Sequence, residues 1–321
     1  MNTPFEPIEP ADLTGVRTYS IQKRRNLVDS SAFASRVGPE DSIGQFLDSL
    51  PDILAGKSLR ELCQVVARAH AGGRSVGIAI GGHVVKCGLG PLLIDLMERG
   101  VIDGILMHGA TAIHDTEIAR LGQTSEDVGA TLKEGRFGMA EETASFFSQA
   151  YTRAVEEGRG LGHALGQSLL DEKAPNADCS LLAACARLGR PAMVVVAVGT
   201  DIVHMHPGFD AGALGQASYT DFRLLVTYVR GLGNGVWINI GSAVLLPEAF
   251  VKAVNLAHNL GDDLDGLVTA NLDMLRHYRT RVNVLRRPAQ KGIEIIGHHE
   301  INVPLLRVGV LAELSALAEE S

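Results

Sequence analysis

The chain has 321 residues, of which 46% are hydrophobic and 5% aromatic, and it contains 36 glycines. A chain of this length and composition can bury a large core, as one big domain or as two fused ones. The formal net charge is −8 at pH 7. A general nucleic-acid binder needs a basic face that displaces counterions, so this charge argues against such a partner.

The sequence shows no signal for secretion, membrane insertion or a cysteine-based metal site. The N-terminal stretch MNTPFEPIEPADL is proline-rich and lacks the apolar centre of a secretory signal. No apolar run approaches the roughly 20 residues of a membrane helix. Cys63, Cys87, Cys179 and Cys185 form no C-x-x-C pair, which excludes a zinc ribbon and a dithiol motif. We therefore expect a soluble cytoplasmic protein with no membrane partner.

Residues 1–74 are expected to form an N-terminal arm followed by helices. Several prolines near the start restrict the backbone and favour an extended arm over residues 1–40. Apolar residues at helical spacing follow at 42–54 and 58–73, and a Gly-Gly pair ends the second of these segments.

From residue 75 to the end, alternating strand and helix patterns predict one α/β domain. The expected strands are 75–80, 101–110, 191–199, 235–241 and 264–271; the expected helical segments are 88–100, 114–122, about 139–188, 217–233, 246–261 and about 303–318. The strands are short, continuous and rich in Val, Ile and Leu, as in a parallel sheet covered on both faces. The sequence therefore predicts a doubly wound, Rossmann-like parallel sheet over residues 75–321.

Polar residues, together with several glycines and one alanine, lie at the ends of the predicted strands. Ligands bind to such a sheet outside the carboxyl ends of its strands. Those residues are Gly81, Gly82, His83, Lys86, His108, Gly109, His114, Asp115, Asp201, His204, His206, Gly241, Ser242, Thr269, Ala270, His298, His299 and Glu300. Seven of the eleven histidines are among them. Because imidazole serves proton transfer and metal ligation near neutral pH, this clustering indicates a functional site.

The first strand ends in glycines and a lysine that allow two interpretations. Gly81, Gly82, Gly88 and Gly90 would let the backbone approach a phosphate at a helix N-terminus, or would simply form a tight strand–helix turn. They do not match the dinucleotide pattern G-x-G-x-x-G. Lys86 would contact a phosphate or carboxylate, or would lie on the surface as most lysines do.

The third strand is followed by candidates for acid–base chemistry or metal binding. Asp201 follows an apolar run, so it either contacts a ligand or caps the next turn. His204 and His206 would lie on one side of an extended segment, where zinc could use both. The further metal ligands would come from this set: Asp115, Asp201, His298 and Glu300.

The stretch GGHVVKCGLGPLLIDLMERGVIDGILMHGATAIHD (81–115) resembles deoxyhypusine synthase. Further stretches resemble that family in the same order, at 191–202, 238–255, 267–273 and 297–306. The resemblance implies a Rossmann-like fold, NAD at the strand ends, and a homotetramer with sites at subunit interfaces. It also implies a transferase of the deoxyhypusine or homospermidine synthase type, which oxidises spermidine and passes on an aminobutyl group through a lysine imine.

The chain keeps some positions of the family's site and departs at others. The retained positions are Gly88, Asp115, Asp201, Gly241, Thr269 and Ala270. The family's imine-forming lysine should fall between Asp273 and Pro288, where DMLRHYRTRVNVLRRP contains no lysine. An arginine cannot replace it, because an imine needs a neutral amine. The family's amine-binding His-His pair is replaced by Pro247-Glu248, and histidine takes four other site positions: His83, His108, His114 and His298.

The first functional hypothesis is a divergent deoxyhypusine-synthase-like enzyme that binds NAD and acts on a small amine or related metabolite, without true deoxyhypusine synthesis. Asp201 or His114 would be the general base, with Asp115 and Lys86 as further catalytic candidates. The candidate cofactor-binding residues are Gly81, Gly82, His83, His108, Gly109, Gly241, Ser242, Thr269, Ala270 and His298.

Two alternatives stay open. The first is a hydrolase or lyase that depends on zinc or another divalent metal, held by His204, His206, His298 and Glu300. The second is a non-catalytic binding protein that kept the fold and lost the chemistry. Whether the protein is an enzyme is therefore left open. The expected partners are a small-molecule substrate and further copies of the chain, with no nucleic acid.

Overall fold

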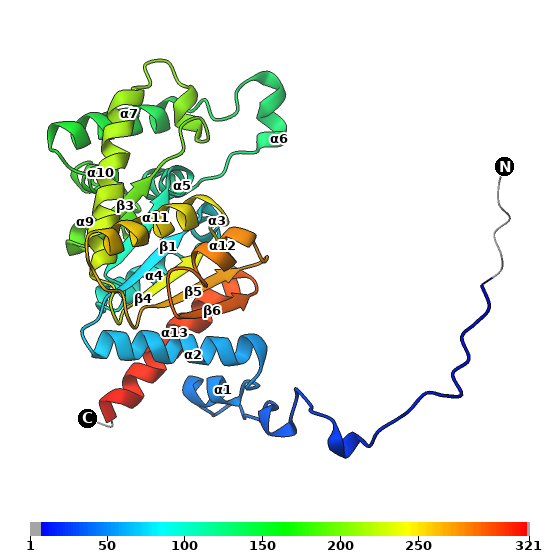
Figure 1. Cartoon of the computed structure of the whole chain (residues 1–321). Coiled ribbons are helices and arrows are strands. Elements are labelled where there is room, and N and C mark those ends of the chain that lie inside the picture. The colour runs from blue at the N-terminus through cyan, green and yellow to red at the C-terminus, as the bar shows by residue number, and fades with distance from the viewer. Residues whose placement is uncertain (1–7, 320–321) are drawn as a thin grey trace, which may run out of the picture.

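A sheet of six parallel strands runs through the centre of the computed structural model, which describes residues 8–319 (Figure 1). The strands are β1 (Val76–Ile80), β2 (Gly104–His108), β3 (Ala192–Val195), β4 (Val236–Ile240), β5 (Val268–Asp273) and β6 (Lys291–Ile296). Their order is β3-β2-β1-β4-β5-β6, and every neighbouring pair is parallel. The strand order reverses between β1 and β4, which makes that point the switch point of a doubly wound sheet. The predicted fold class is confirmed.

Helices cover both faces of this sheet. They are α1 (Ile43–Ser49), α2 (Leu54–Ala71), α3 (Gly82–Lys86), α4 (Gly90–Glu98), α5 (Gly109–Leu121), α6 (Val128–Thr131), α7 (Glu141–Glu156), α8 (Leu161–Asp171), α9 (Leu181–Leu188), α10 (Ala211–Arg230), α11 (Leu245–Asn259), α12 (Tyr278–Asn283) and α13 (His299–Glu319). Short 3-10 turns lie at η1 (Ile21–Lys23), η2 (Ser30–Ala32), η3 (Leu132–Glu134), η4 (Ala177–Cys179) and η5 (Ile202–Met205).

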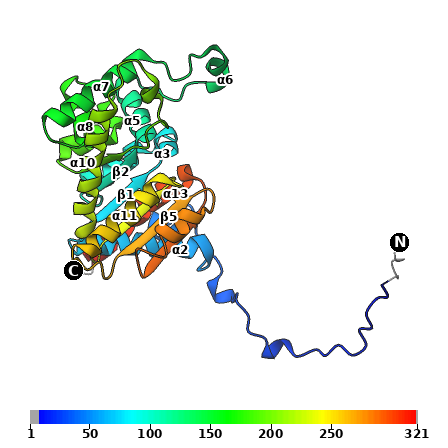
Figure 2. The ribbon, with the colours of Figure 1, turned by 45° about the horizontal axis from the view of Figure 1, so that its top comes forward.

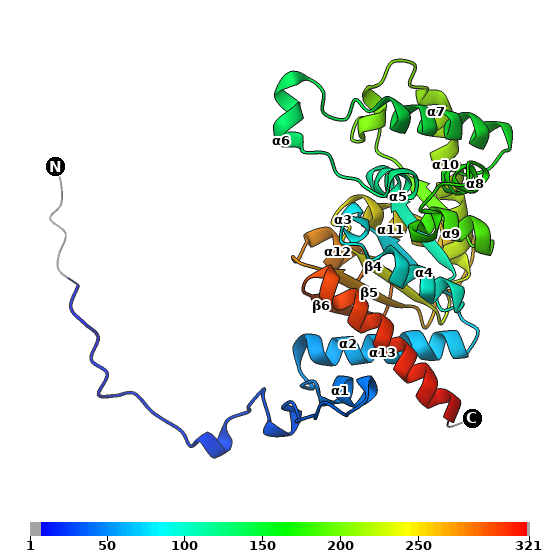
Figure 3. The ribbon, with the colours of Figure 1, turned by 180° about the vertical axis from the view of Figure 1, so that it is seen from behind.

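Successive side chains of each strand point to opposite faces, and this alternation divides the core into two layers. Ile78 and Ile238 face the layer that holds α2, α4 and α13, seen from behind in Figure 3. Trp237 faces α10 and α11, where its ring stacks on Phe250 with the centroids 4.6 Å apart. Figure 2 shows α10 and α11 side by side over the strands. Trp237 has no exposed surface and is a core residue.

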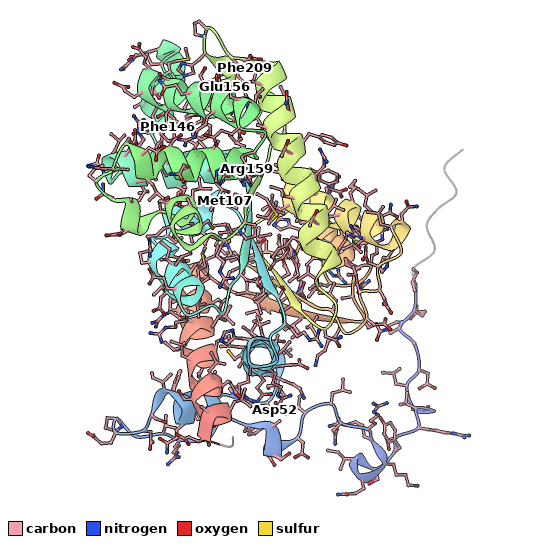
Figure 4. The ribbon with its side chains drawn as sticks, turned by 90° about the vertical axis from the view of Figure 1, so that its left-hand side faces the viewer. Asp52, Met107, Phe146, Glu156, Arg159 and Phe209 are labelled. Carbon is pink, nitrogen blue, oxygen red and sulfur yellow. The ribbon has the colours of Figure 1, made fainter. Side chains whose placement is uncertain are left out.

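A further layer of helices, α7 to α10, packs around the edge strand β3. Figure 4 places Phe146 and Phe209 in this layer, away from Met107 on β2. The ring of Tyr151 packs edge-on against Phe147 and Phe209, and Phe147 packs in turn against Phe146. A continuous row of aromatic rings therefore holds this layer together.

The sixth strand, β6, was not among the five strands expected from the sequence. It is an edge strand that pairs only with β5, and its first two residues are exposed. Only Ile293 and Ile295 reach the core. A strand that buries alternate residues lacks the continuous apolar run by which the other strands were found.

The N-terminal segment extends away from the sheet (Figures 1 and 3). It joins the body where the Ser35 N–H donates to the Ser49 carbonyl (3.0 Å) and the Asp52 N–H donates to the Ala32 carbonyl (2.9 Å). Residues 1–7 of the expected arm lie outside the described residues. After the arm, α2 packs against β1, β4, β6 and α13, and the division of the chain at residues 74 and 75 stays a prediction.

The C-terminal helix α13 is long and apolar enough to cross a membrane by length and composition alone, with a mean hydropathy of 1.5 over its 18-residue window. The sequence reading missed this run. The helix packs along α2 and contributes Val303, Leu306 and Val310 to the core. One such helix is weak evidence for a membrane span, and the packing assigns it to the outer layer of the α/β fold.

We expect Gly104→Ala to destabilise the fold. A Cβ at this position of β2 would lie 2.5 Å from the ring of Tyr228, and overpacking of this kind costs about 1–3 kcal/mol. The control is Gly215→Ala in α10, where a Cβ meets nothing within 4 Å. Alanine there should stabilise the helix by about 0.5–1 kcal/mol. Urea unfolding of both variants checks this, and equal effects would contradict the packing described.

Candidate functional site

A cavity of about 630 Å³ lies outside the carboxyl ends of β2 and β3. Its floor is the start of α5 and the end of α3, and its roof is the segment 125–140, which carries α6 (Figures 1 and 3). The ionisable residues that line it are Lys86, His114, Glu117, Glu126, Arg136 and Asp201. The volume is in the range of small-molecule sites. Three of the four residues predicted to be catalytic therefore share one cavity.

The position of His114 follows from where α5 begins. The helix starts directly after β2, at Gly109, whereas the sequence suggested a start near 114. His108 caps this helix, because its Nδ1 accepts the Thr111 N–H at 3.3 Å. His114 consequently lies in the second turn of α5 and faces Gly82, whose ideal Cβ position is 3.7 Å from Nε2 of His114. His108 is a helix cap at the cavity floor, and a cofactor contact for it stays a prediction.

The environment of His114 keeps its imidazole neutral. Burial lowers the pKa of His114 to about 4, and the charges of Lys86 and His108 add to this effect. Its Nδ1 is 2.7 Å from the Thr124 hydroxyl. A neutral imidazole at pH 7 can accept a proton, so the geometry suits a general base.

Asp201 lies against the N-terminus of α5. A Cβ on Gly109 would be 1.8 Å from Oδ2 of Asp201, so only glycine leaves room for this carboxylate. The carboxylate accepts the Ala110 N–H, and burial raises the pKa of Asp201 to about 6 against that hydrogen bond and one from Thr200. Asp201 is 7% exposed and is mostly ionised at neutral pH. It can bind a cation in the cavity.

The His204 side chain lies against Asp201 and contacts the backbone of its segment. Its Nδ1 accepts the N–H groups of Gly199 (3.1 Å) and Asp201 (3.2 Å), so its proton is on Nε2. That Nε2 is buried, finds no hydrogen-bond partner in the described part of the chain, and lies 3.8 Å from Oδ2 of Asp201. Burial lowers the pKa of His204. His204 is therefore a neutral neighbour of the carboxylate.

Lys86 is an exposed cation at the edge of the cavity. It is the last residue of α3 and forms no ion pair within residues 8–319. It is close enough to His114 to lower the pKa of that imidazole. An unpaired ammonium next to a neutral base and a buried carboxylate can hold an anionic group of a ligand.

A second group of predicted residues meets at the switch point, where the turn after β1 touches the turn after β4. A Cβ on Gly81 would lie 2.0 Å from the Gly241 carbonyl oxygen. Gly241 has a φ of +67°, and a Cβ there would be 2.7 Å from Nε2 of His299. The two glycines are therefore explained by the contact between the turns. Ser242 follows in the same turn, and the ring of His83 lies 5.9 Å from that of His299.

The cofactor role of Thr269 and Ala270 stays a prediction. The sequence placed the end of this strand at residue 271, but β5 continues to Asp273. Thr269 pairs with Trp237, and neither Thr269 nor Ala270 has exposed surface. Both residues therefore lie within the strand, before its carboxyl end.

Asp115 lies in a buried hydrogen-bond network, and its catalytic role stays a prediction. Its carboxylate is 1% exposed and accepts hydrogen bonds from the Ser180 hydroxyl (2.5 Å), the Leu181 N–H (2.9 Å) and the Leu182 N–H (3.1 Å). Those donors are at the start of α9. Asp115 and His114 are adjacent on α5 and point in different directions. Asp115 joins α5 to α9 as a buried cap.

The structure does not bring the predicted metal ligands together. The segment of His204 is the 3-10 turn η5, where residues two apart do not share a face, and Nε2 of His206 bonds instead to the Gly138 carbonyl (2.8 Å). His298 is exposed and lies 3.8 Å from Glu300, at the start of α13. Across residues 8–319, no group of three or more His, Cys, Asp or Glu side chains is placed to hold a metal ion. The metal hypothesis has no geometric support.

Two functional candidates, Glu117 and Thr124, were not singled out from the sequence, and a third, His299, was named at the strand ends without a role. Glu117 is three residues after His114 on α5, and a search for partners on the same helix face would have found it. His299, rather than His298, turns inward: it is 1% exposed, and burial lowers its pKa. Thr124 precedes the cavity roof, where no periodic pattern indicates which residues turn inward.

No protein-family model and no curated protein matches the chain. Among solved structures, a conserved putative LOR/SDH protein from Methanococcus maripaludis S2 matches with a TM-score of 0.50 and 17% identity, over 88% of this chain and 73% of that one. AgrE, solved with ornithine and NAD+, matches with a TM-score of 0.52 and 13% identity, over 84% of this chain and 35% of its own. A putative deoxyhypusine synthase from Entamoeba histolytica matches with a TM-score of 0.48 and 11% identity, over 85% and 94%.

These similarities concern the fold. The solved neighbours include a deoxyhypusine-synthase-like protein, the family that the sequence resembles. The Rossmann-like α/β fold is shared with the LOR/SDH protein and AgrE. The chain spans about a third of the length of AgrE.

We expect Asp115→Ala to cost roughly 1–3 kcal/mol or more in stability, because it leaves buried donors of α9 without an acceptor. The matched control is Asp210→Ala, which removes an exposed cap that accepts the Ala213 N–H at the start of α10 (2.9 Å). That cap should be worth about 1 kcal/mol. Urea unfolding compares the two variants. A stable Asp115→Ala protein would contradict the structural role of Asp115.

Proposed function

We propose that the protein is an NAD-dependent enzyme that acts on a small metabolite carrying an amine. The observation that carries this proposal is the meeting of His114, Lys86 and Asp201 in one cavity that adjoins the switch point of the sheet. Gly82, which begins α3 directly after the β1 turn, is in contact range of the His114 ring. A cofactor at the switch point would therefore be next to the base. AgrE, which has a similar fold, was solved with ornithine and NAD+.

The residues at the switch point fit NAD in part. His299 is buried, and its Nδ1 has no hydrogen-bond partner among the described residues, so a polar group of a ligand would satisfy it. With His83 and the Gly241–Ser242 turn, it would form the polar contacts of the cofactor. When bound, NAD+ supplies an acceptor for a hydride from the substrate. Gly81 has no side chain and therefore lets the turn after β1 pack closely against the turn after β4.

Different side chains of the cavity would bind different groups of the substrate. The Asp201 carboxylate, at the start of α5, would hold the substrate's ammonium group. Lys86 would hold an anionic group such as a carboxylate. His114, neutral at pH 7, would take up a proton as the carbon next to the amine is oxidised. Opposite charges on the two sides of the cavity favour an amino acid over a polyamine.

Transfer through a lysine imine is no part of the proposal. The segment 274–287, where the resemblance would place the family's lysine, forms the region around α12 and supplies arginines. Two of them are bound to acidic residues: Arg276 to Glu294 (2.9 Å) and Arg279 to Glu248 (3.2 Å). We propose a homo-oligomer, as the resemblance implies.

We expect isothermal titration calorimetry to detect NAD+ binding and His299→Gln to weaken it at least tenfold, because the buried imidazole contacts the cofactor. The matched control is His298→Gln, one residue earlier and exposed, which should bind NAD+ like the unchanged protein. Thermal unfolding of both variants checks that they fold. Absence of NAD+ binding in the unchanged protein would overturn the cofactor assignment.

We expect the protein to reduce NAD+ in the presence of amino acids that carry a side-chain amine, of which ornithine is the first to test. Spermidine should give little NAD+ reduction. The absorbance of NADH measures the rate. The kcat/KM should fall below pH about 6, because the pKa of Asp201 is raised to about 6 and its protonation removes the ammonium site. The pKa of His114, about 4, predicts that the base stays neutral through that range. Asp201→Asn should lower kcat/KM and abolish the fall near pH 6. A fall that persists in this variant would assign it to another group.

A further inference from the structure

We propose that Glu117 and Thr124 are positioning residues of this site: they hold the His114 imidazole with its proton on Nδ1, so that Nε2 presents its lone pair for proton transfer. The part of this inference that concerns proton transfer rests on the proposed function. The part that concerns the imidazole does not, and it can be tested without a substrate. Neither residue was predicted from the sequence, and neither would touch the reacting atoms.

The three side chains form one continuous chain of hydrogen bonds. Nδ1 of His114 lies 2.7 Å from the Thr124 hydroxyl, which in turn lies 2.5 Å from Oε2 of Glu117. His114 and Glu117 are three residues apart on α5 and so share a helix face. Thr124 comes from the segment beyond the helix and closes the gap between them. All three side chains are at least partly buried.

The direction of these hydrogen bonds follows from the number of protons available. A carboxylate only accepts, so the single hydroxyl proton of Thr124 points to Glu117. The Thr124 oxygen can then only accept from His114, which requires the proton on Nδ1. Because the pKa of His114 is well below 7, the imidazole carries one proton, and Nε2 is unprotonated. Nε2 lies next to Gly82 and forms no hydrogen bond within residues 8–319.

The same carboxylate is held in place from its other side. Oε1 of Glu117 accepts the Thr143 hydroxyl at 3.2 Å, and Thr143 belongs to the first turn of α7. Glu117 is thus fixed by two threonines, of which only Thr124 contacts His114. This arrangement provides a matched pair of variants: removing either hydroxyl takes one hydrogen bond from Glu117, but only one of the two changes the surroundings of the imidazole.

Thr124 also connects the base to the roof of the cavity. The roof segment begins with the next residue, Ser125, and Glu126 Oε2 accepts the Gly138 N–H at 2.7 Å, which joins the two ends of the segment. Displacing the roof would pull Thr124 from Nδ1. The proton position of His114 therefore depends on the same segment that encloses the cavity.

The test is NMR of the full-length protein labelled with 15N-histidine, at pH 7, where the shifts of the two ring nitrogens report which one carries the proton. His114→Gln identifies the His114 signals by their loss. We expect a single Nδ1-protonated form of His114 in the unchanged protein. Thr124→Val should give a mixture or the Nε2-protonated form, whereas Thr124→Ser should restore the original state.

Thr143→Val is the control and should leave His114 protonated on Nδ1. Should Thr124→Val fail to fold, Glu117→Ala serves instead, because a freed Thr124 hydroxyl can donate to Nδ1 and admit the other form. An Nε2-protonated His114 in the unchanged protein overturns the proposal. So does a folded Thr124→Val protein that keeps the proton on Nδ1, because the two residues then have only a structural role.

Turnover separates this proposal from the proposed function. With a substrate whose oxidation reduces NAD+, Thr124→Val should lower kcat at least tenfold with little change in KM. Thr143→Val should change kcat and KM less than tenfold. If the protein turns over none of the amines, the proposed function fails while the NMR result still decides the role of Glu117 and Thr124. A tenfold rise in KM with kcat unchanged would contradict a role in positioning the base.

Discussion

The candidate site depends on the contact between the Asp201 carboxylate and Gly109 at the start of α5. Gly109 follows β2 directly, so the helix begins at the edge of the sheet. A side chain at this position would overlap the carboxylate, which reaches the helix N-terminus from the turn after β3. Because negative charge is stabilised at a helix N-terminus, Asp201 remains largely ionised although it is buried. The same early start of α5 places His114 in the cavity.

The cavity holds two titratable groups with opposite tendencies. Burial raises the pKa of Asp201 and lowers that of His114. At neutral pH the result is a carboxylate that can bind a cation and an imidazole that can accept a proton, in the same cavity as the ammonium group of Lys86. Groups whose surroundings separate their protonation states in this way are typical of acid–base sites. Burial also raises the pKa of Asp115 to about 6, so the location of Asp201 and His114 in one cavity, and not the shifts alone, makes them candidates for acid–base chemistry.

The fold and half of the site followed from the sequence because both depend on local patterns. Continuous apolar strands predicted the parallel sheet, and the rule that ligands bind at carboxyl strand ends selected Lys86, His114 and Asp201. The edge strand β6 was not predicted from the sequence, because it buries only alternate residues. For Asp115 and Thr269 the exact element ends decide whether a side chain faces the cavity: α5 begins at Gly109 and not near 114, and β5 continues to Asp273 and does not end at 271. Thr124 could not be found, since tertiary packing alone brings it to His114.

A crystal structure of the protein with NAD+ and ornithine tests the proposed site most directly. We expect the nicotinamide next to Gly82 and His114, the ornithine ammonium on Asp201, its carboxylate on Lys86, and polar contacts of the cofactor with His299. A cofactor bound at another edge of the sheet, or a cavity that takes neither molecule at concentrations that saturate solution binding, would contradict it.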